Sequence, residues 1–465
     1  MTAFAWTDLE VRRALGLRLD LVKDGLRFTE ISTDTRTLQP GALYVALSGD
    51  RFDGHDFVAD AVAGGARAVV VSRALPAARD IVTYPVDDTL VALGRLAHHR
   101  RMQLDCPVVA ITGSSGKTTT KDFLAAALAT ARRTHATRGN RNNRVGVPLT
   151  LLEAPQESEV VVVEVGTSEP GEIKALTEIT SPDVGVVTTV GASHLEGLGS
   201  VEGVLREKLD LLRGLPEGAK AVVGDEPVTL VEEARAIMPQ VRVAGWSDRA
   251  DERARPAGAE ADAFGRYRFR WHGHVVSVPM SGKHAVSNAL LALTVADLLG
   301  VPAAKAAHGL EGAATAAMRG QTRTIGGLTV LVDCYNANPQ SARAALELLE
   351  AYGAADGRVA VLGTMLELGE SSSRYHDEVL ADALARDIDV VVAVGGFAEA
   401  AERMSAPADR VLVAKDWQSG YPLLKDRLAG DEVILLKASR GVALEGVLDL
   451  LEADFGPDET EEAQG

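Results

Sequence analysis

One short segment carries the residue types that hold a nucleoside triphosphate. Residues 113–118 read Gly-Ser-Ser-Gly-Lys-Thr and stand between the apolar run VVAIT and an Ala/Leu-rich stretch. Small residues let backbone N–H groups face a phosphate, while Lys117 can reach its outer oxygens and Thr118 can coordinate Mg²⁺. Ile111 stands where the commoner GxxxxGK[ST] pattern has its first glycine, so this loop is the short kind. The predicted phosphate contacts are Gly113, Ser114, Ser115, Gly116, Lys117, Thr118 and Thr119.

A carboxylate follows the next apolar run. Glu164 ends VVVVE, where it would lie at the carboxyl edge of a predicted strand, the edge at which α/β ligand sites collect. Its carboxylate suits Mg²⁺. A purely structural acid is the alternative, and in either case a buried carboxylate needs partners. Kinases, motors and ligases share the phosphate loop, so these two features alone do not specify a reaction.

The elements that would position these residues follow an α/β pattern. Residues 40–71 read as strand, loop, helix and strand. Residues 88–103 read as a helix that leads to the phosphate loop, and buried parallel strands are expected from there to about residue 223. Residues 266–280 alternate about a His-Gly pair and predict an exposed hairpin. Four further strand candidates lie in residues 328–339, 358–365, 389–396 and 432–439.

This order predicts three α/β domains, as does a length of 465 residues. We expect a small α/β unit over residues 1–86 and a central P-loop ATPase with a parallel sheet over residues 87–313. A Rossmann-like domain should occupy residues 314–455. Residues 456–465 carry several acids and almost no apolar side chains, which is typical of a disordered tail.

The composition limits the kinds of partner. Hydrophobic residues make up 46% of the chain, and no apolar stretch approaches the roughly 18 residues of a membrane span. The formal net charge of −17 repels nucleic acid and anionic membranes, so an anion site must be built locally. The N-terminus lacks the pattern of an export signal, and Cys106 and Cys334 stand far apart as free thiols. We therefore expect a cytoplasmic protein with no nucleic-acid partner and no membrane insertion.

A series of segments resembles the Mur ligase family. In chain order they are STDTR, DGHDF, TGSSGKTTT, TRGNRNNRVGVPLTLL, EVGTSEPGEI, ASHLEGLGS, GKHAVSNAL, DCYNANPQS, LGTMLELGESSSRYH and KASRG. The match spans nearly the whole chain. The GNRNNRVGVPLTLL, YNANP and MLELG segments favour the member that adds a dipeptide, and the Asp-Asn-Pro-Arg stretch usual in the sibling that adds the third-position diamino acid is absent.

The resemblance implies a reaction and a role in it for the N-terminal and C-terminal domains. ATP would phosphorylate the terminal carboxylate of UDP-N-acetylmuramoyl-tripeptide, and the amine of D-alanyl-D-alanine would then attack the acyl phosphate to give the pentapeptide precursor of peptidoglycan. Such chemistry needs Mg²⁺, two anions brought together and water excluded. The N-terminal domain would hold UDP, while the C-terminal domain would bring the amine and close over ATP. We expect the chain to act as a monomer.

The resemblance also implies roles for single residues. His194 would be a metal ligand. Lys208 reads as a solvated helix lysine on pattern alone, but the family's lysine here is typically carbamylated, and only the modified form could bind a second Mg²⁺. Arg319 would bind the transferring phosphoryl group through its planar fork. These three residues would act with Lys117 and Glu164. The other implied nucleotide contacts are Asn288, Asp333, Tyr335 and Asn336.

Substrate contacts are implied at three places. Residues 140–144 form a polar loop expected near the acyl phosphate or the muramoyl phosphates, and residue 338 is placed near the dipeptide. Ordinary turn chemistry is the alternative for these loops. The implied substrate residues are Ser32, Thr33, Asp34, Arg36, Gly54, His55, Asn140, Asn142, Asn143, Arg144 and Asn338. Two other functions stay open: a sibling or related amide ligase using another amine or carboxylate, and a P-loop ATPase that drives a partner without making a bond.

Overall fold

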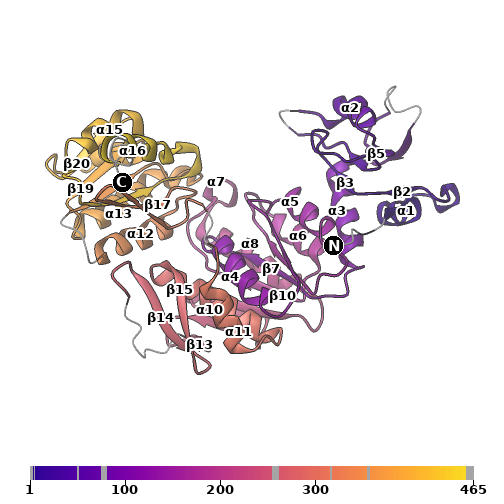
Figure 1. Cartoon of the computed structure of the whole chain (residues 1–465), viewed down its shortest axis with the longest axis horizontal. Coiled ribbons are helices and arrows are strands. Elements are labelled where there is room, and N and C mark those ends of the chain that lie inside the picture. The colour runs from indigo at the N-terminus through magenta and orange to yellow at the C-terminus, as the bar shows by residue number, and fades with distance from the viewer. Residues whose placement is uncertain are drawn as a thin grey trace, which may run out of the picture.

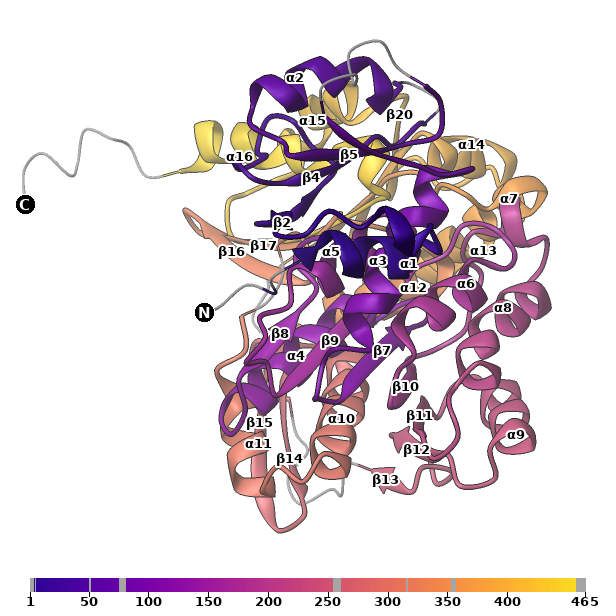
Figure 2. The same ribbon diagram turned by 90° about the vertical axis from the view of Figure 1, so that its right-hand side faces the viewer.

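The computed structural model describes residues 4, 6–49, 52–74, 81–253, 261–314, 317–352 and 357–456. Three α/β bodies lie in a row, with the N-terminal body at one end and the C-terminal body at the other (Figure 1). Figure 2 views this row from its N-terminal end. Of the predicted acidic tail, residues 457–465 lie outside the described residues. Among the described residues, no helix has the length and apolar character needed to cross a membrane.

The N-terminal body is built on a small parallel sheet. Its elements are β1 Trp6–Thr7, α1 Asp8–Leu15, η1 Leu19–Leu21, β2 Arg27–Phe28, β3 Ile31–Ser32, β4 Leu43–Val45, η2 Gly54–Phe57, α2 Val58–Ala63, β5 Ala68–Val71 and β6 Val82–Pro85. The strand order is β3-β4-β5-β6. Alternate residues of β4 and β5 enter two cores, one on each face of the sheet. The predicted strand, loop, helix and strand over residues 40–71 are therefore confirmed.

The central body is a seven-stranded parallel sheet with helices on both faces. Its elements are α3 Thr89–Arg101, β7 Val108–Thr112, α4 Lys117–Ala129, β8 Thr134–Ala136, α5 Gly146–Leu152, β9 Val160–Glu164, α6 Glu172–Thr180, β10 Val184–Val187, α7 Leu195–Leu198, α8 Val201–Arg213, β11 Lys220–Gly224, α9 Val228–Ile237, β12 Arg242–Gly245, β13 Glu252–Arg253, β14 Arg266–Trp271, β15 His274–Ser281, α10 Lys283–Leu298 and α11 Ala303–Glu311. The strand order is β13-β12-β11-β10-β7-β9-β8. The helices α4 and α10 cover one face, and α6 and α8 cover the other. Burial on both faces explains the unbroken apolar runs of β7 and β9.

The hairpin of β14 and β15 corrects one prediction. The turn falls at His272 and Gly273, whose φ angles of 45° and 82° suit a tight two-residue turn. The hairpin was expected to be exposed, but one face is packed. Phe269, Trp271 and Val276 are at most 2% exposed and join the core that contains α10 and α11. Only the alternate side chains face solvent, as the period of two requires.

The C-terminal body is a six-stranded mixed sheet. Its elements are β16 Gln321–Ile325, β17 Leu328–Asp333, α12 Pro339–Ala351, β18 Arg358–Leu362, η4 Gly369–Ser371, α13 Ser372–Ala385, β19 Val390–Val394, α14 Gly396–Arg403, β20 Val411–Ala414, α15 Trp417–Lys425, β21 Val433–Lys437, η5 Arg440–Val442, η6 Leu444–Gly446 and α16 Val447–Phe455. The order is β16-β17-β21-β18-β19-β20, with β16 antiparallel to β17. The four predicted strands are β17, β18, β19 and β21. Strands β16 and β20, which form the two edges of this sheet, were not predicted.

Removing methyl groups from the packed face of the hairpin should destabilise the central body. Val276 is 0% exposed, so Val276→Ala should lower the free energy of unfolding by about 2 kcal/mol. Val275→Ala is the matched control: Val275 is 55% exposed, so its replacement should cost less than about 0.5 kcal/mol. Urea unfolding followed by circular dichroism measures both. Equal losses for the two variants would contradict the packing of this hairpin.

Candidate active site

The phosphate loop connects β7 to α4 through two glycines that no other residue can replace without strain. Gly113 has a φ of 147° and Gly116 a φ of 81°. A Cβ on Gly113 would lie 1.9 Å from Thr188 Oγ1, and one on Gly116 would lie 2.3 Å from Asn288 Oδ1. Both contacts are far below van der Waals distance. The loop therefore adopts its turn because glycine permits the backbone and leaves room for neighbours from β10 and α10.

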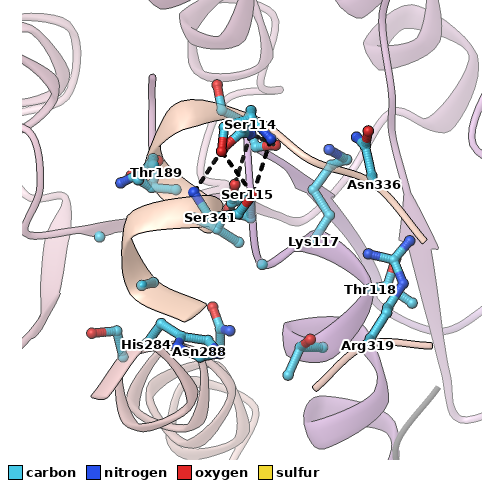
Figure 3. A pocket seen from close by; sticks show the side chains of 18 of the residues that line it. Ser114, Ser115, Lys117, Thr118, Thr189, His284, Asn288, Arg319, Asn336 and Ser341 are labelled. Atoms are coloured by element: carbon cyan, nitrogen blue, oxygen red, sulfur yellow. Dashed lines mark hydrogen bonds between the residues drawn. The ribbon is translucent and has the colours of Figure 1, made fainter. Parts of the chain in front are cut away.

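A cavity of about 810 Å³ lies beside this loop, where the central and C-terminal bodies meet. It opens at the carboxyl ends of the parallel strands β7, β9 and β10, the usual place for a ligand in an α/β fold. Figure 3 shows Lys117 of the central body together with Arg319 and Asn336 of the C-terminal body. Most predicted site residues line this cavity: Ser114, Ser115, Gly116, Lys117, Thr118, Thr119, Asn142, Asn143, Glu164, His194, Asn288, Arg319, Asp333, Tyr335, Asn336 and Asn338.

Glu164 joins three parts of the site. It ends β9, and its carboxylate accepts hydrogen bonds of 2.8 Å from the hydroxyl of Thr118 and 2.8 Å from the amide of Asn142. Its side chain is almost fully buried, and its backbone N–H donates to Thr137 Oγ1. A carboxylate and a hydroxyl side by side are oxygen ligands of the kind that Mg²⁺ takes.

The side chains beside the phosphate loop suit Mg²⁺ better than a metal ion held by protein ligands alone. No group of three or more His, Cys, Asp or Glu side chains among the described residues could hold a metal ion alone. Mg²⁺ usually needs no such cage, because it binds through one or two carboxylates together with phosphate oxygens and water. The Glu164 and Thr118 oxygens beside the phosphate loop fit that pattern.

Two lysines of the central body differ in their hydrogen bonding. The Lys117 ammonium donates 2.7 Å to the carbonyl of Gly113, and burial lowers its pKa. Lys208 on α8 is fully buried, and its Nζ has no hydrogen-bond partner within the described parts of the chain. Burial, and then the positive charge of Lys117, hold the pKa of Lys208 well below its usual value. Lys208 does not line the cavity, and the prediction of a solvated lysine from pattern alone is wrong.

The C-terminal body contacts the phosphate loop directly. Asn338 caps α12 by accepting from Ser341 N–H at 2.8 Å, and its amide nitrogen donates 3.0 Å to Ser115 Oγ. Two residues further along, Gln340 Nε2 donates 3.0 Å to Thr189 Oγ1. The side chain predicted to contact the dipeptide therefore also reaches the phosphate loop.

The remaining C-terminal residues form a charged wall. The Arg319 guanidinium lies 4.0 Å from the centre of the Tyr335 ring, a cation–π contact. Asp333 pairs at 2.6 Å with the buried ammonium of Lys437, which also donates 2.8 Å to the carbonyl of Asn336. Arg319 thus presents a cation that no carboxylate contacts within the described residues.

Several residues of the site were not predicted. Glu367 Oε2 lies 2.7 Å from His194 Nδ1, so the C-terminal body also reaches the metal-ligand candidate. Lys437, Gln340, His284 and Trp246 line the cavity. Glu367 and Lys437 belong to the MLELG and KASRG segments already singled out, which was the available signal. Nothing in the sequence marked Trp246.

The remaining substrate-binding candidates divide into two groups. Ser32, Thr33 and Asp34 line a second cavity of about 890 Å³ between the N-terminal and central bodies. The other candidates, Arg36, Gly54, His55, Asn140 and Arg144, line neither of the two cavities.

Two of the outlying candidates serve the local fold. A Cβ on Gly54 would lie 2.6 Å from the carbonyl oxygen of Leu47. The buried His55 ring lies 2.6 Å from Asp53 Oδ1 through Nδ1 and accepts at Nε2 from the N–H of Ser72 at 2.9 Å. Both ring nitrogens are therefore engaged within the N-terminal body.

Arg36 forms an ion pair with Asp34. Its guanidinium is largely exposed and forms a hydrogen-bonded pair with Asp34 at 2.6 Å, which lowers the pKa of Asp34 to about 2. This pair holds one wall of the second cavity in its charged form.

Comparison with known proteins places these features in a family. Residues 111–296 match the Mur ligase middle domain, residues 318–440 match the Mur ligase glutamate ligase domain, and residues 27–101 match the Mur ligase family catalytic domain. The chain belongs to the Mur ligase family. As a Mur ligase, it is an ATP-dependent enzyme that forms amide bonds.

Similar Mur ligases share the whole architecture. The UDP-N-acetylmuramoyl-tripeptide–D-alanyl-D-alanine ligase of Bacillus subtilis is 36% identical over 430 residues, covering 91% of this chain and 93% of the relative. The crystal structure of MurF from Acinetobacter baumannii matches with a TM-score of 0.89 and 32% identity, covering 98% of this chain and 100% of the relative. MurF from Thermotoga maritima in complex with ADP matches with a TM-score of 0.80 and 28% identity over 93% and 99% of the two chains.

A single methyl group on the phosphate loop should weaken nucleotide binding. Gly116→Ala would meet Asn288 Oδ1 and hold an alanine at a φ of 81°, so we expect ADP to bind at least about tenfold more weakly. Gly218→Ala is the control, because Gly218 has a φ of 83° but nothing within 4 Å of its added Cβ. Isothermal titration calorimetry measures both affinities. Equal weakening would indicate that general destabilisation, and not the loop, is responsible.

Proposed function

We propose that this Mur ligase joins D-alanyl-D-alanine to UDP-N-acetylmuramoyl-tripeptide, with ATP cleaved to ADP and phosphate. The observation that carries the proposal is one cavity in which the phosphate loop and Glu164 of the central body face Arg319 and Asn338 of the C-terminal body. Relatives that carry this activity in their names match nearly the whole chain. We further propose that domain boundaries lie near residues 86 and 313.

The residues support a two-step transfer. In the first step a carboxylate oxygen of the tripeptide attacks the γ-phosphorus, the bond to the bridging oxygen breaks, and ADP leaves. In the second step the dipeptide amine attacks the acyl carbon, the bond to phosphate breaks, and the amine nitrogen loses a proton. Lys117 and Arg319 supply positive charge from two bodies, so both can stabilise charge that develops on the phosphoryl oxygens.

Mg²⁺ is part of the proposal. Thr118 and Glu164 would hold it, and His194 with a carbamylated Lys208 would hold a second ion. Bound there, Mg²⁺ would neutralise charge on the phosphates. The buried amine of Lys208 supports the second site: it lacks a partner among the described side chains, and its lowered pKa favours the neutral form that reacts with carbon dioxide.

The second cavity supports binding of the nucleotide end of the substrate. Besides Ser32, Thr33 and Asp34, it is lined by arginines of the central body, whose forked cations suit phosphate oxygens. These arginines are Arg133, Arg138 and Arg141. We infer that UDP binds here, that the chain acts in the cytoplasm on this nucleotide-linked substrate, and that a monomer suffices because both cavities are built from one chain.

The reaction itself is tested with all components. Purified protein, ATP, Mg²⁺, UDP-N-acetylmuramoyl-tripeptide and D-alanyl-D-alanine should yield phosphate and the pentapeptide in equal amounts, measured by a phosphate assay and mass spectrometry. Omission of any one component should abolish the pentapeptide. Product with a different amine would favour a sibling ligase, whereas phosphate release without any amide product would favour an ATPase that acts on a partner.

Carbamylation of Lys208 has a direct signature. In buffer with ¹³C-labelled bicarbonate, the native protein should show a carbamate carbon resonance that is absent from Lys208→Met, which keeps the apolar stem but lacks the amine. Ligase activity should fall at least about a hundredfold in the variant, because a ligand to the metal is lost. Lys220→Met is the control, since Lys220 is exposed. A native spectrum without the resonance would refute the modification.

A further inference from the structure

A loop of the C-terminal body crosses to the central body at His194. The Glu367 carboxylate lies 2.7 Å from His194 Nδ1, and the Glu367 carbonyl accepts from the N–H of Glu196 at 3.3 Å. Both His194 and Glu367 have positive φ angles, 52° and 64°. Non-glycine residues adopt this region at a cost and keep it where the surroundings impose it. The contact therefore joins two backbone positions that each body holds in an uncommon conformation.

The C-terminal body fixes the loop that carries Glu367. His376, buried on α13, accepts from Met365 N–H at 3.0 Å and approaches the carbonyl of Ser372 at 2.7 Å with its other ring nitrogen. On the other side, Leu366 N–H donates 2.9 Å to the hydroxyl of Ser439. Glu367 thus directly follows two residues whose backbone N–H groups are anchored within the C-terminal body.

Ser439 also links this loop to the phosphate loop. Its hydroxyl contacts the carbonyl of Ala337 at 3.3 Å, next to Asn338, whose amide reaches Ser115. One buried hydroxyl therefore connects the two C-terminal loops that make the contacts at His194 and at Ser115.

The Glu367 contact determines which nitrogen of His194 remains available. Nδ1 is shielded from solvent and lies at ion-pair distance, 2.7 Å, from the carboxylate, without the alignment of a hydrogen bond and with no other partner among the described residues, while His194 lines the cavity beside the phosphate loop. This leaves Nε2 as the nitrogen free for the cavity. Metal-binding histidines generally hold their second nitrogen against a carboxylate or carbonyl, which fixes the ring and its tautomer.

We propose that Glu367 is a positioning residue: through His194 Nδ1 it orients Nε2 toward the second metal ion, the one assigned above to His194, and it does so only when the C-terminal body is docked. This inference rests on the proposed function for the identity of the metal site. It adds that the central body cannot complete its own site, because the carboxylate that orients its histidine comes from another body.

The test uses Mn²⁺ as the probe in place of Mg²⁺, with ADP bound to the full chain. Electron spin echo measurements should detect nitrogen coupled to Mn²⁺ in the native protein, and none in His194→Ala. Glu367→Ala should weaken or remove that coupling and lower Mn²⁺ affinity about 10- to 100-fold. Glu367→Gln, which retains an oxygen acceptor, should restore part of the affinity. Alanine and glutamine are β-carbon-bearing residues like glutamate, so the backbone strain at this position is unchanged.

The control is Glu370→Ala, which removes an equal charge from the same exposed loop. It should leave Mn²⁺ affinity and nitrogen coupling as in the native protein. In the double variant of His194 and Glu367, the loss of affinity should equal that of His194→Ala alone, because Glu367 acts through the histidine.

The outcomes separate this inference from the proposed function. If the native protein makes the pentapeptide but Glu367→Ala keeps native affinity and coupling, the positioning role is refuted and the function stands. If the fold-losses in Mn²⁺ affinity of His194→Ala and Glu367→Ala multiply in the double variant, Glu367 does not act through His194. If no pentapeptide forms but Glu367→Ala still removes the coupling, the inference stands and the substrate assignment fails.

Discussion

The hydrogen bond between Glu164 and Thr118 is the contact on which the site depends. A carboxylate that is 1% exposed must be satisfied by its neighbours, and Glu164 finds them in the first turn of α4 and in the Asn142 loop. These contacts tie the end of β9 to the phosphate loop that follows β7. Because the two strands are adjacent and parallel, their carboxyl ends and the loops that follow them are brought to one edge.

That edge supplies anion-binding groups but only part of the positive charge that a transferred phosphoryl group requires. The central body offers Lys117, which is partly buried in the cavity wall and whose ammonium donates to the carbonyl of Gly113. Arg319 comes from the C-terminal body, as does Asn338, which contacts Ser115. The cavity is therefore complete only with residues from both bodies.

Features that depend on residues close together in the sequence could be predicted from it. The phosphate loop was readable because glycine, lysine and threonine act at fixed spacing between a strand and a helix. The strands β7, β9 and β21 were readable because burial on both faces demands continuous apolar runs. Strand β16 was missed because, as an antiparallel edge strand, it exposes Thr322, Arg323 and Thr324 and carries no apolar period. Glu367 was missed because its partner is set by docking of two bodies.

The burial of two neighbouring residues on α8 could not be predicted from the sequence pattern. Lys208 reads as a solvated helix lysine, yet both it and its neighbour Glu207 are buried. Glu207 accepts 2.8 Å hydrogen bonds from the N–H groups of Gly171 and Ile173, so its burial is explained by holding the start of α6. Lys208 has no such partner in the described structure, and an apolar side chain of similar length would fill its place without the cost of desolvating an amine. Packing and hydrogen bonding therefore do not explain the buried amine of Lys208, which supports the proposal that it acts in the neighbouring site.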